Sequence, residues 1–591
     1  MKKINIFILF SLLMATISCN QEMLDVYPKG EVVLANLSNK DGVELLLLGA
    51  YSALDGQNVT IMNRNDLFGN AALSFSDWLF GSMQSDDAYK GSSAGDQTVI
   101  NFIEGYEIQS AGNTLNVSRW KYAYDGITRC NDVIKAAISA EDMTEDEKNA
   151  VIAQARFLRG HFYCELTISY INVPWIDENT IDPAKISNDH IVWPEIQADF
   201  EYAAEHLPSR WSSGSIGRAT SWAAKTYLAR VYMYQNDYAS AKPILNDVYT
   251  NGGYTLMNDF QFNFDINHRN NEESIFEDQR CEDGLFFGAN AGFGDFLNYP
   301  VFGPMASGYG FFQPSYSLVS AFFTDPATGL PIQLGKNYQS SDMPTVYDAT
   351  DVTVVKLTEP IDPRLDFTVG RPGVPFKDWG IQPATAWIGS ISNGGPFLNK
   401  KNMFGQNESN WFRRAFGGKC ANNFRKLRLD HVILWLAECE VETGGDLNKA
   451  MNLVNEIRTR AKNSSWLTYT QVDIEVFEAA YPKDAGKFTA GEYAGNYKIE
   501  LYTSFPNVEY ARNAVRMEQR LEFGMEGIRF FDLVRWGEAA DVLQNYINVE
   551  STRMGHLQGK IFNKGVDEYL PIPQEQIDLY PEILMQNDYR D

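Results

Sequence analysis

The chain has 591 residues, a formal net charge of −26 at pH 7, and a composition that is 44% hydrophobic and 13% aromatic. An acidic balance of this size repels phosphate backbones, so we expect no nucleic-acid partner. With six scattered cysteines and no CxxC spacing, a chain of this size is not expected to depend on a disulfide framework. Six histidines without HxxxH or HExxH spacing give no reason to expect a zinc site.

The N-terminus has the pattern of an export signal. A basic start, Met1–Lys3, precedes an apolar run, Ile4–Met14, and small residues then lead to Cys19. The run is too short to span a membrane, which takes ~20 apolar residues. The ending resembles a bacterial lipobox, with Thr16 where leucine is usual. We expect residues 1–18 to be a signal peptide and Cys19 to carry lipid; the alternative is an ordinary secreted protein.

Several segments show the 3.6-residue periodicity of amphipathic helices, and they come in pairs joined by tight turns. The pairs are 132–140 with 145–169, 224–234 with 241–252, and 429–439 with 450–461. Antiparallel helix pairs are the unit of tetratricopeptide-like arrays. Since no sequence period is visible, we expect degenerate, structural repeats and a mainly α fold.

Residues 281–425 differ from the rest. They are a quarter of the chain, yet they hold 18 of its 45 glycines, and their apolar residues keep neither helical nor strand period. A long irregular stretch in a compact protein is usually functional. We therefore expect residues 19–591 to form a single unit, with a helical scaffold at 19–280, a loop-rich ligand face at 281–425 and a second helical region at 426–591.

Short motifs spread over nearly the whole chain point to one family. They are LDVYP at 24–28, QARFLRG at 154–160, VPW at 173–175, GRAT at 217–220, DPRLD at 362–366, RLEFGMEGIRFFDLVRW at 520–536, LPIP at 570–573 and QNDY at 586–589. In this order they resemble the motifs of the SusD/RagB family of outer-membrane nutrient-binding lipoproteins. Ile528 stands where the family has histidine, and QNDY lacks the usual Pro-Gly.

These motif residues are expected to be structural. The charges of Glu522, Arg529, Asp532 and Arg535 suit internal ion pairs, and Gly527 suits a left-handed position after a helix.

The resemblance implies a function. Members of the family are surface lipoproteins that bind glycans or other nutrients, lie as a lid on a SusC-like TonB-dependent transporter, and hand their cargo to it without chemistry. Their fold is a tetratricopeptide-like scaffold with an irregular ligand face. We therefore expect a non-catalytic glycan binder on the cell surface, without a cofactor.

Sugars stack on aromatic rings and bind carboxylates, amides and Arg through their hydroxyls, and three irregular places offer this mixture. The candidates are Trp78, Asp86, Asp87 and Tyr89 in the first; Phe293, Tyr299 and Tyr309 in the second; and Arg371, Trp379 and Trp387 in the third. The alternative for each Trp is a place in the core. Asp86 and Asp87 are also candidates for calcium, with a solvated acidic turn as the alternative.

Other functions stay open. Residues 91–95 (GSSAG) match a nucleophile elbow, but that motif needs a strand before it and a helix after it, and we expect a polar loop before it. A surface glycoside hydrolase needs only two suitably spaced carboxylates, which 76 Asp and Glu residues neither show nor exclude. The third alternative is an interaction protein whose helical faces bind peptides. A non-sugar nutrient such as a peptide also stays open as the cargo.

Overall fold

The computed structural model describes residues 34–587 except 57–68, 109–112, 282–291, 306–307, 345–346, 348–353, 355, 409–410 and 415–416. The predicted signal peptide, Cys19 and the motif at 24–28 lie outside the described residues. In the part that is described, no helix is both long enough and apolar enough to cross a membrane.

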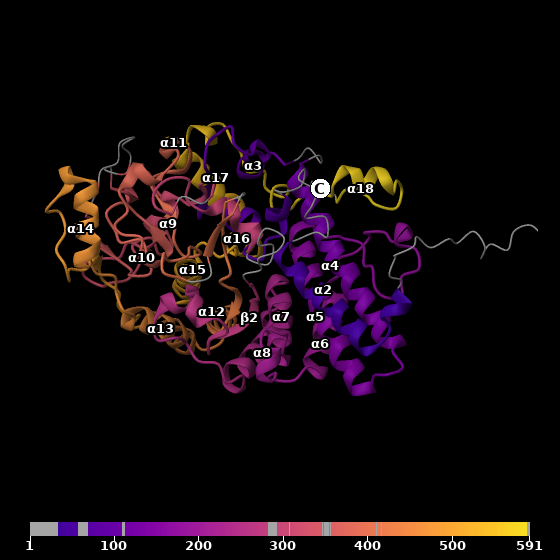
Figure 1. Cartoon of the computed structure of the whole chain (residues 1–591). Coiled ribbons are helices and arrows are strands. Elements are labelled where there is room, and N and C mark those ends of the chain that lie inside the picture. Colours follow the sequence, from indigo (N-terminus) through magenta and orange to yellow (C-terminus); the bar gives the residue numbers. More distant parts are fainter. Residues whose placement is uncertain are drawn as a thin grey trace, which may run out of the picture.

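A stack of antiparallel helices forms one side of the molecule (Figure 1). Its members are α2 (Lys40–Ser52), α4 (Thr114–Ser139), α5 (Glu145–Tyr170), α6 (Trp193–His206), α7 (Ser221–Tyr234), α8 (Tyr238–Asn251), α12 (Leu429–Glu442) and α13 (Leu447–Asn463). From α4 to α13 each helix packs on the next in this order, and α2 packs on both α4 and α5. The pairs α4–α5, α7–α8 and α12–α13 confirm the three predicted pairs. Helix α6, which the sequence reasoning missed, connects the first pair to the second.

Local sequence explains where these helices begin. The side chain of Asn113 accepts hydrogen bonds from the first turn of α4, and Thr144 and Glu147 form a capping box at the start of α5. Asp446 caps α13, directly after the predicted Gly-Gly turn. Caps of this kind satisfy backbone N–H groups that have no partner inside the helix.

The rest of the C-terminal region is also helical. It contains α14 (Gln471–Ala480), α15 (Val508–Phe523), α16 (Arg529–Arg535), α17 (Ala539–Glu550) and α18 (Gln574–Leu579). Helix α15 packs against both α12 and α13, which ties this region to the scaffold.

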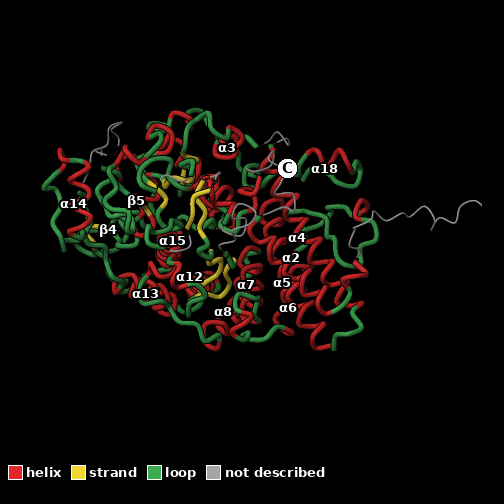
Figure 2. Tube along the Cα trace, viewed as in Figure 1, coloured by secondary structure: helices red, strands yellow, loops and turns green. Residues whose placement is uncertain are grey.

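Loops and short elements make up the other side of the molecule (Figure 2). Its helices are α3 (Thr98–Glu104), α9 (Tyr316–Ala321), α10 (Leu365–Thr368) and α11 (Ile391–Gly394). Two-stranded sheets join β1 (Ala88–Gly91) to β3 (Phe311–Pro314), β2 (Ser274–Asp278) to β9 (Phe424–Arg428), β5 (Val369–Gly370) to β6 (Leu398–Asn399), β7 (Trp411–Arg414) to β8 (Gly417–Cys420), and, in parallel, β4 (Pro360–Ile361) to β10 (Asn496–Tyr497). These pairings bring distant segments together, and one hydrophobic core extends from Val43 to Ile572.

Two backbone segments cross in close contact at Gly527. Its φ is +77°, and a Cβ placed there would lie 2.0 Å from the carbonyl oxygen of Ser76. A Cβ on Gly81 would in turn lie 1.9 Å from the carbonyl oxygen of Gly527. The left-handed conformation predicted for Gly527 is confirmed, but α15 has already ended at Phe523. The glycine is therefore needed for the crossing as well as for its φ.

We expect Gly527→Ala to destabilise the protein far more than Gly537→Ala. Gly537 has φ +71° but nothing within 4 Å of its Cβ position, so its substitution costs only the left-handed conformation, about 1–2 kcal/mol. Gly527→Ala adds a clash with backbone that cannot yield without moving a buried segment. Urea unfolding of both variants measures the difference, and equal losses would show that the crossing imposes no constraint.

Candidate functional site

The motif residues at 362–366 and 520–536 form a buried ionic network. The Arg364 guanidinium contacts Asp362 at 2.7 Å, Glu518 at 2.7 Å and Glu522 at 2.9 Å. All four side chains are at most 1% exposed. They are therefore structural and are not accessible to a ligand.

The other predicted ion pairs are also confirmed. Arg535 contacts Asp532 and Glu438, each at 2.7 Å, and Arg529 contacts Asp86 at 2.9 Å. The family-like signature thus joins α16 to α12 and to the turn before β1.

The first predicted sugar site lies in the protein interior, which corrects the expectation of a ligand platform there. The ring of Trp78 is fully buried, and its Nε1 donates to the carbonyl of Gly294 at 3.1 Å. Tyr89 is also fully buried, and its hydroxyl donates to Glu550. Neither ring has an exposed face on which a pyranose could stack.

The carboxylates of Asp86 and Asp87 are occupied by guanidinium groups. Asp86 contacts Arg520 and Arg529 at 2.9 Å each, and Asp87 contacts Arg520 at 3.1 Å. Both aspartates are buried, so neither the expected ligand-binding turn nor a solvated acidic turn describes them. Among the described residues there is also no cluster of three or more His, Cys, Asp or Glu side chains suited to a metal ion.

The pKa values of the two neighbouring aspartates are shifted in opposite directions. Burial raises the pKa of Asp87 to about 6. Burial and the charge of the adjacent Asp86 together outweigh the attraction of the Arg520 guanidinium. Burial also opposes ionisation of Asp86, but Arg520 and Arg529 together hold its pKa below the usual range.

The second and third predicted sites meet in one satellite core. Tyr299, Trp379 and Trp387 are 3%, 7% and 6% exposed and pack together with Phe376 and Phe404. The sequence placed these three aromatics in two regions, and the fold brings them together, but as packing residues with little exposed surface.

The remaining candidates are dispersed. Arg371 is fully buried and binds Asp366 through two hydrogen bonds of 2.6 and 2.8 Å, which corrects its assignment to the ligand face. Tyr309 is half-buried, with its ring edge-on to Phe296. Phe293 begins the short helix η11 (Phe293–Asn298), and its side chain is outside the described part.

The expected polar loop before residues 91–95 is instead strand β1, which ends at Gly91. Helix α3, however, begins only at Thr98, after an intervening turn. A nucleophile elbow requires a sharp turn from strand directly into helix. This segment therefore lacks the geometry of the motif.

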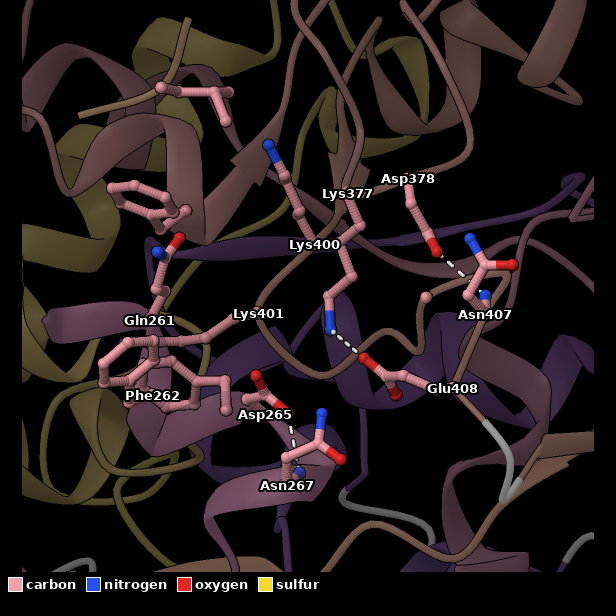
Figure 3. A pocket seen from close by; sticks show the side chains of 14 residues that line it. Gln261, Phe262, Asp265, Asn267, Lys377, Asp378, Lys400, Lys401, Asn407 and Glu408 are labelled. Carbon is pink, nitrogen blue, oxygen red and sulfur yellow. Dashed lines mark hydrogen bonds and ion pairs between the residues drawn. The ribbon is translucent and has the colours of Figure 1, made fainter. Parts of the chain in front are cut away.

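A pocket of about 450 Å³ lies beside the satellite core (Figure 3). Its lining comes from five stretches of chain, at 261–267, 367, 377–378, 400–408 and 467, and combines phenyl rings with amide, carboxylate and ammonium groups. The lining residues are Gln261, Phe262, Phe264, Asp265, Asn267, Phe367, Lys377, Asp378, Lys400, Lys401, Gly405, Asn407, Glu408 and Leu467. This volume lies within the usual range for ligand pockets, ~300–1,000 Å³.

The rim of the pocket is held by its own polar contacts. Lys377 pairs with Glu408 at 3.6 Å, and Asp378 accepts hydrogen bonds from the backbone N–H groups of Gln406 and Asn407 (Figure 3). These contacts fix the 405–408 loop over the pocket. Three residues with side-chain amides also line this rim: Gln261 is half-buried, and Asn267 and Asn407 are exposed.

Two buried lysines lie beneath the rim. Lys400 donates to the carbonyls of Asp366 and Pro375 at 2.5 and 2.6 Å, and burial lowers its pKa to about 7. Lys401 donates to the carbonyl of Glu522 and to the carboxylate of Glu526, and burial lowers its pKa as well. Their ammonium groups are thus already hydrogen-bonded within the protein.

Trp379, which was predicted to bind the ligand, instead supports the loop that forms the rim of this pocket. Its Nε1 donates to the carbonyl of Phe404 at 2.9 Å, which holds the loop that carries the rim. The sequence reasoning did not name the rim itself. The alternation of aromatic and polar residues at 260–265 (FQFNFD) was the signal that could have identified it.

Paired helices that carry a loop-built pocket define a ligand-binding scaffold of the tetratricopeptide-like class, and comparisons with known proteins specify it further. Residues 272–589 match the model of the SusD family, and residues 58–233 match a model described as starch-binding, associating with outer membrane. The chain therefore belongs to the SusD family.

Three known proteins resemble the chain over nearly all of its length. A SusD-like protein of Formosa agariphila is 20% identical over 610 residues, covering 100% of this chain and 99% of the relative. Surface glycan-binding protein A of Bacteroides thetaiotaomicron has a TM-score of 0.63 at 20% identity, with 94% of this chain and 100% of that chain covered. A laminarin-binding SusD-like protein has a TM-score of 0.61 at 20% identity, with 93% and 99% covered.

We expect the free energy of unfolding of Asp87→Asn, relative to that of the wild type, to increase as pH rises from 4 to 8. Because the folded pKa of Asp87, about 6, lies above its unfolded value, its contribution is present at low pH and is lost as pH rises through 6. The relative gain is about 3 kcal/mol. Urea unfolding across this pH range measures it.

Asp86→Asn is the matched control for this experiment. Since the pKa of Asp86 is lowered, its contribution is present at every pH above its unfolded pKa of about 3.9 and is lost only as pH falls below that value. The deficit of Asp86→Asn should therefore be constant from pH 4 to 8 and shrink only below pH 4. Parallel pH profiles for the two variants would contradict the assignment.

Proposed function

We propose that this protein is a non-catalytic, cell-surface lipoprotein that captures a polysaccharide or oligosaccharide at the outer membrane and delivers it to a SusC-like TonB-dependent transporter. The observation that carries the proposal is the pocket of Figure 3 in a chain of the SusD family. Relatives of the same fold are named for binding glycans and laminarin.

The pocket suits a sugar for reasons of chemistry. The ring of Phe262 is half-buried and is held in place by His268, which stacks on it with centroids 4.1 Å apart. A pyranose places its apolar face on such a ring, as other ligands do on aromatic platforms. The amides at the rim can then bind hydroxyl groups as donors and as acceptors.

The same contacts support binding rather than catalysis. A glycosidase needs one carboxyl group free to donate a proton and a second that acts as base or nucleophile. Here Glu408 is paired with Lys377, and Asp378 accepts two backbone N–H groups, so both serve to shape the rim. We accordingly propose no catalytic role for these carboxylates.

The location follows from the sequence and the family. The proposed lipid on Cys19 would hold the protein to the membrane, and one matching family model is described as associating with the outer membrane. Within the proposed single unit, the ligand face at 281–425 supplies Phe367 and the rim from 377 to 408. Residues 261–267 of the first helical region and Leu467 of the second complete the pocket.

The first test is a glycan array followed by calorimetry, with the protein from Asn20 onward and an assay for released reducing sugar. Binding to one polysaccharide class without product supports capture. Product release would instead favour the hydrolase alternative, and binding of peptides but not glycans would favour a non-sugar nutrient.

Phe262→Ala should weaken glycan binding about tenfold, the loss expected when ~1.4 kcal/mol of stacking is removed. Phe102→Ala is the matched control, because Phe102 is a 48%-exposed phenylalanine on α3, outside the pocket lining. Calorimetry on the glycan identified by the array measures both. Equal affinities for the two variants would place the site elsewhere.

Trp379→Ala and Trp387→Ala should each destabilise the fold by about 3–5 kcal/mol, because both rings are buried in the satellite core. Thermal or urea unfolding checks this. Loss of binding in these variants would then reflect the displaced 400–408 loop. Unchanged stability would show that the two rings are not core residues after all.

A further inference from the structure

A second pocket, of about 400 Å³, lies far along the chain from the first. It is bounded by α4, by the segment 174–186 that follows α5, and by α18 with the residues after it. We call it the α4–α18 groove. Its lining is mainly aromatic, aliphatic and proline, and includes Trp120, Tyr124, Pro174, Ile176, Tyr580 and Leu584. Figure 1 shows α4 and α18 on the same side of the molecule.

Exposed apolar side chains flank the groove. Ile181 is 98% exposed, and Leu579 and Met585, on either side of Tyr580 and Leu584, are each 64% exposed. Asn188 holds these flanks together, since its side chain bonds to both the N–H and the carbonyl of Met585, at 3.1 and 2.9 Å. A groove bordered by apolar side chains is typical of a surface that another chain segment covers.

Three polar side chains on the α4 side of the groove are already engaged, while Lys121 is exposed at its edge. The hydroxyl of Tyr124 donates to the carbonyl of Pro174 at 2.8 Å, and that of Thr128 donates to the carbonyl of Tyr124. Asp125 pairs with Arg129 at 2.7 Å. The mainly apolar lining therefore favours apolar side chains, which need no polar partners, over a saccharide, whose hydroxyl groups do.

Residues 20–33 of the same chain supply such side chains. This segment of fourteen residues, NQEMLDVYPKGEVV, carries Met23, Leu24, Val26 and Tyr27 close together. The described chain begins at Leu34, in the short helix η2 (Leu34–Leu37), which packs against α4. The chain thus enters the fold on the helix that also lines the groove.

The segment is long enough to reach the groove. The backbone N–H of Lys40 bonds to Asp142, just after α4 ends at Ser139, so the chain enters near the C-terminal end of this helix. Tyr124 lies 15 residues earlier in α4, about 22 Å along a helix. Fourteen extended residues span up to about 46 Å. Because the segment is tethered, its effective concentration is in the millimolar range, so weak contacts suffice to dock it.

We propose that residues 20–33 dock into the α4–α18 groove, with Leu24, Val26 and Tyr27 against its aromatic and proline lining. Cys19 directly precedes this segment, so docking would fix which side of the protein lies next to the membrane. That consequence, unlike the docking itself, rests on the lipid anchor proposed above.

Photo-crosslinking in the mature chain tests the docking. Tyr27→p-benzoylphenylalanine should crosslink within the same molecule to peptides of α4 or of residues 574–585. Tyr580→Asp should reduce the yield at least fivefold, while Tyr493→Asp, at a tyrosine that is 53% exposed and outside the groove lining, should leave it unchanged. Crosslinks to other surfaces, to a second copy, or to none would overturn the proposal.

Hydrogen exchange gives an independent readout that does not involve glycan binding. Removing residues 20–33 should speed amide exchange in 174–186 and 574–585, and a synthetic peptide of residues 20–33 should reverse the change. Equal exchange with and without the segment would contradict docking. If the shortened chain fails to fold, the crosslinking experiment on the full mature chain decides.

Discussion

Arginines buried among carboxylates hold the irregular half of this protein to its helical half. Arg364 in the 362–366 turn binds Glu518 and Glu522 of α15, and Arg428 at the end of β9 binds Asp430 and Glu526. Charges removed from water in this way gain little net free energy as pairs, but loss of one partner costs about 3–5 kcal/mol, because the other is left buried and unpaired. The network therefore fixes where the loops sit on the scaffold.

The candidate pocket depends on that network through its floor. The ammonium group of Lys401 binds the carbonyl of Glu522 and the carboxylate of Glu526, while the same residue lines the pocket. The loop that carries the rim starts from Lys401, which this network holds in place. A few local contacts, such as that of Lys377 with Glu408, are then enough to hold the rim. A rigid base with a loop-built rim is the usual arrangement for a binding site, since loops vary without disturbing the core.

The structural relatives illustrate the separation of fold from specificity. TM-scores of 0.63 and 0.61 accompany sequence identities of only 20%. Such similarity fixes the scaffold of paired helices but not the side chains of a pocket, so the ligand of a relative does not transfer with the fold. The pocket and the α4–α18 groove also share no lining residue. The two proposals, cargo capture in the pocket and docking of the N-terminal segment in the groove, therefore concern separate surfaces.

The sequence by itself determined the helical pairs, the acidic character, the family and the internal ion pairs of Arg529 and Arg535. Helix periodicity and capping are local, and the charges of the 520–536 motif suited internal ion pairs from the start. It did not decide which aromatics face a ligand. Trp78 and Trp379 stand in sequence surroundings typical of a sugar-binding platform, yet both rings lie in the core. Burial of a ring depends on what packs against it from elsewhere in the chain. Likewise, only the tertiary structure assembled a pocket from residues 261–267, 367, 377–378, 400–408 and 467, which have no local pattern in common.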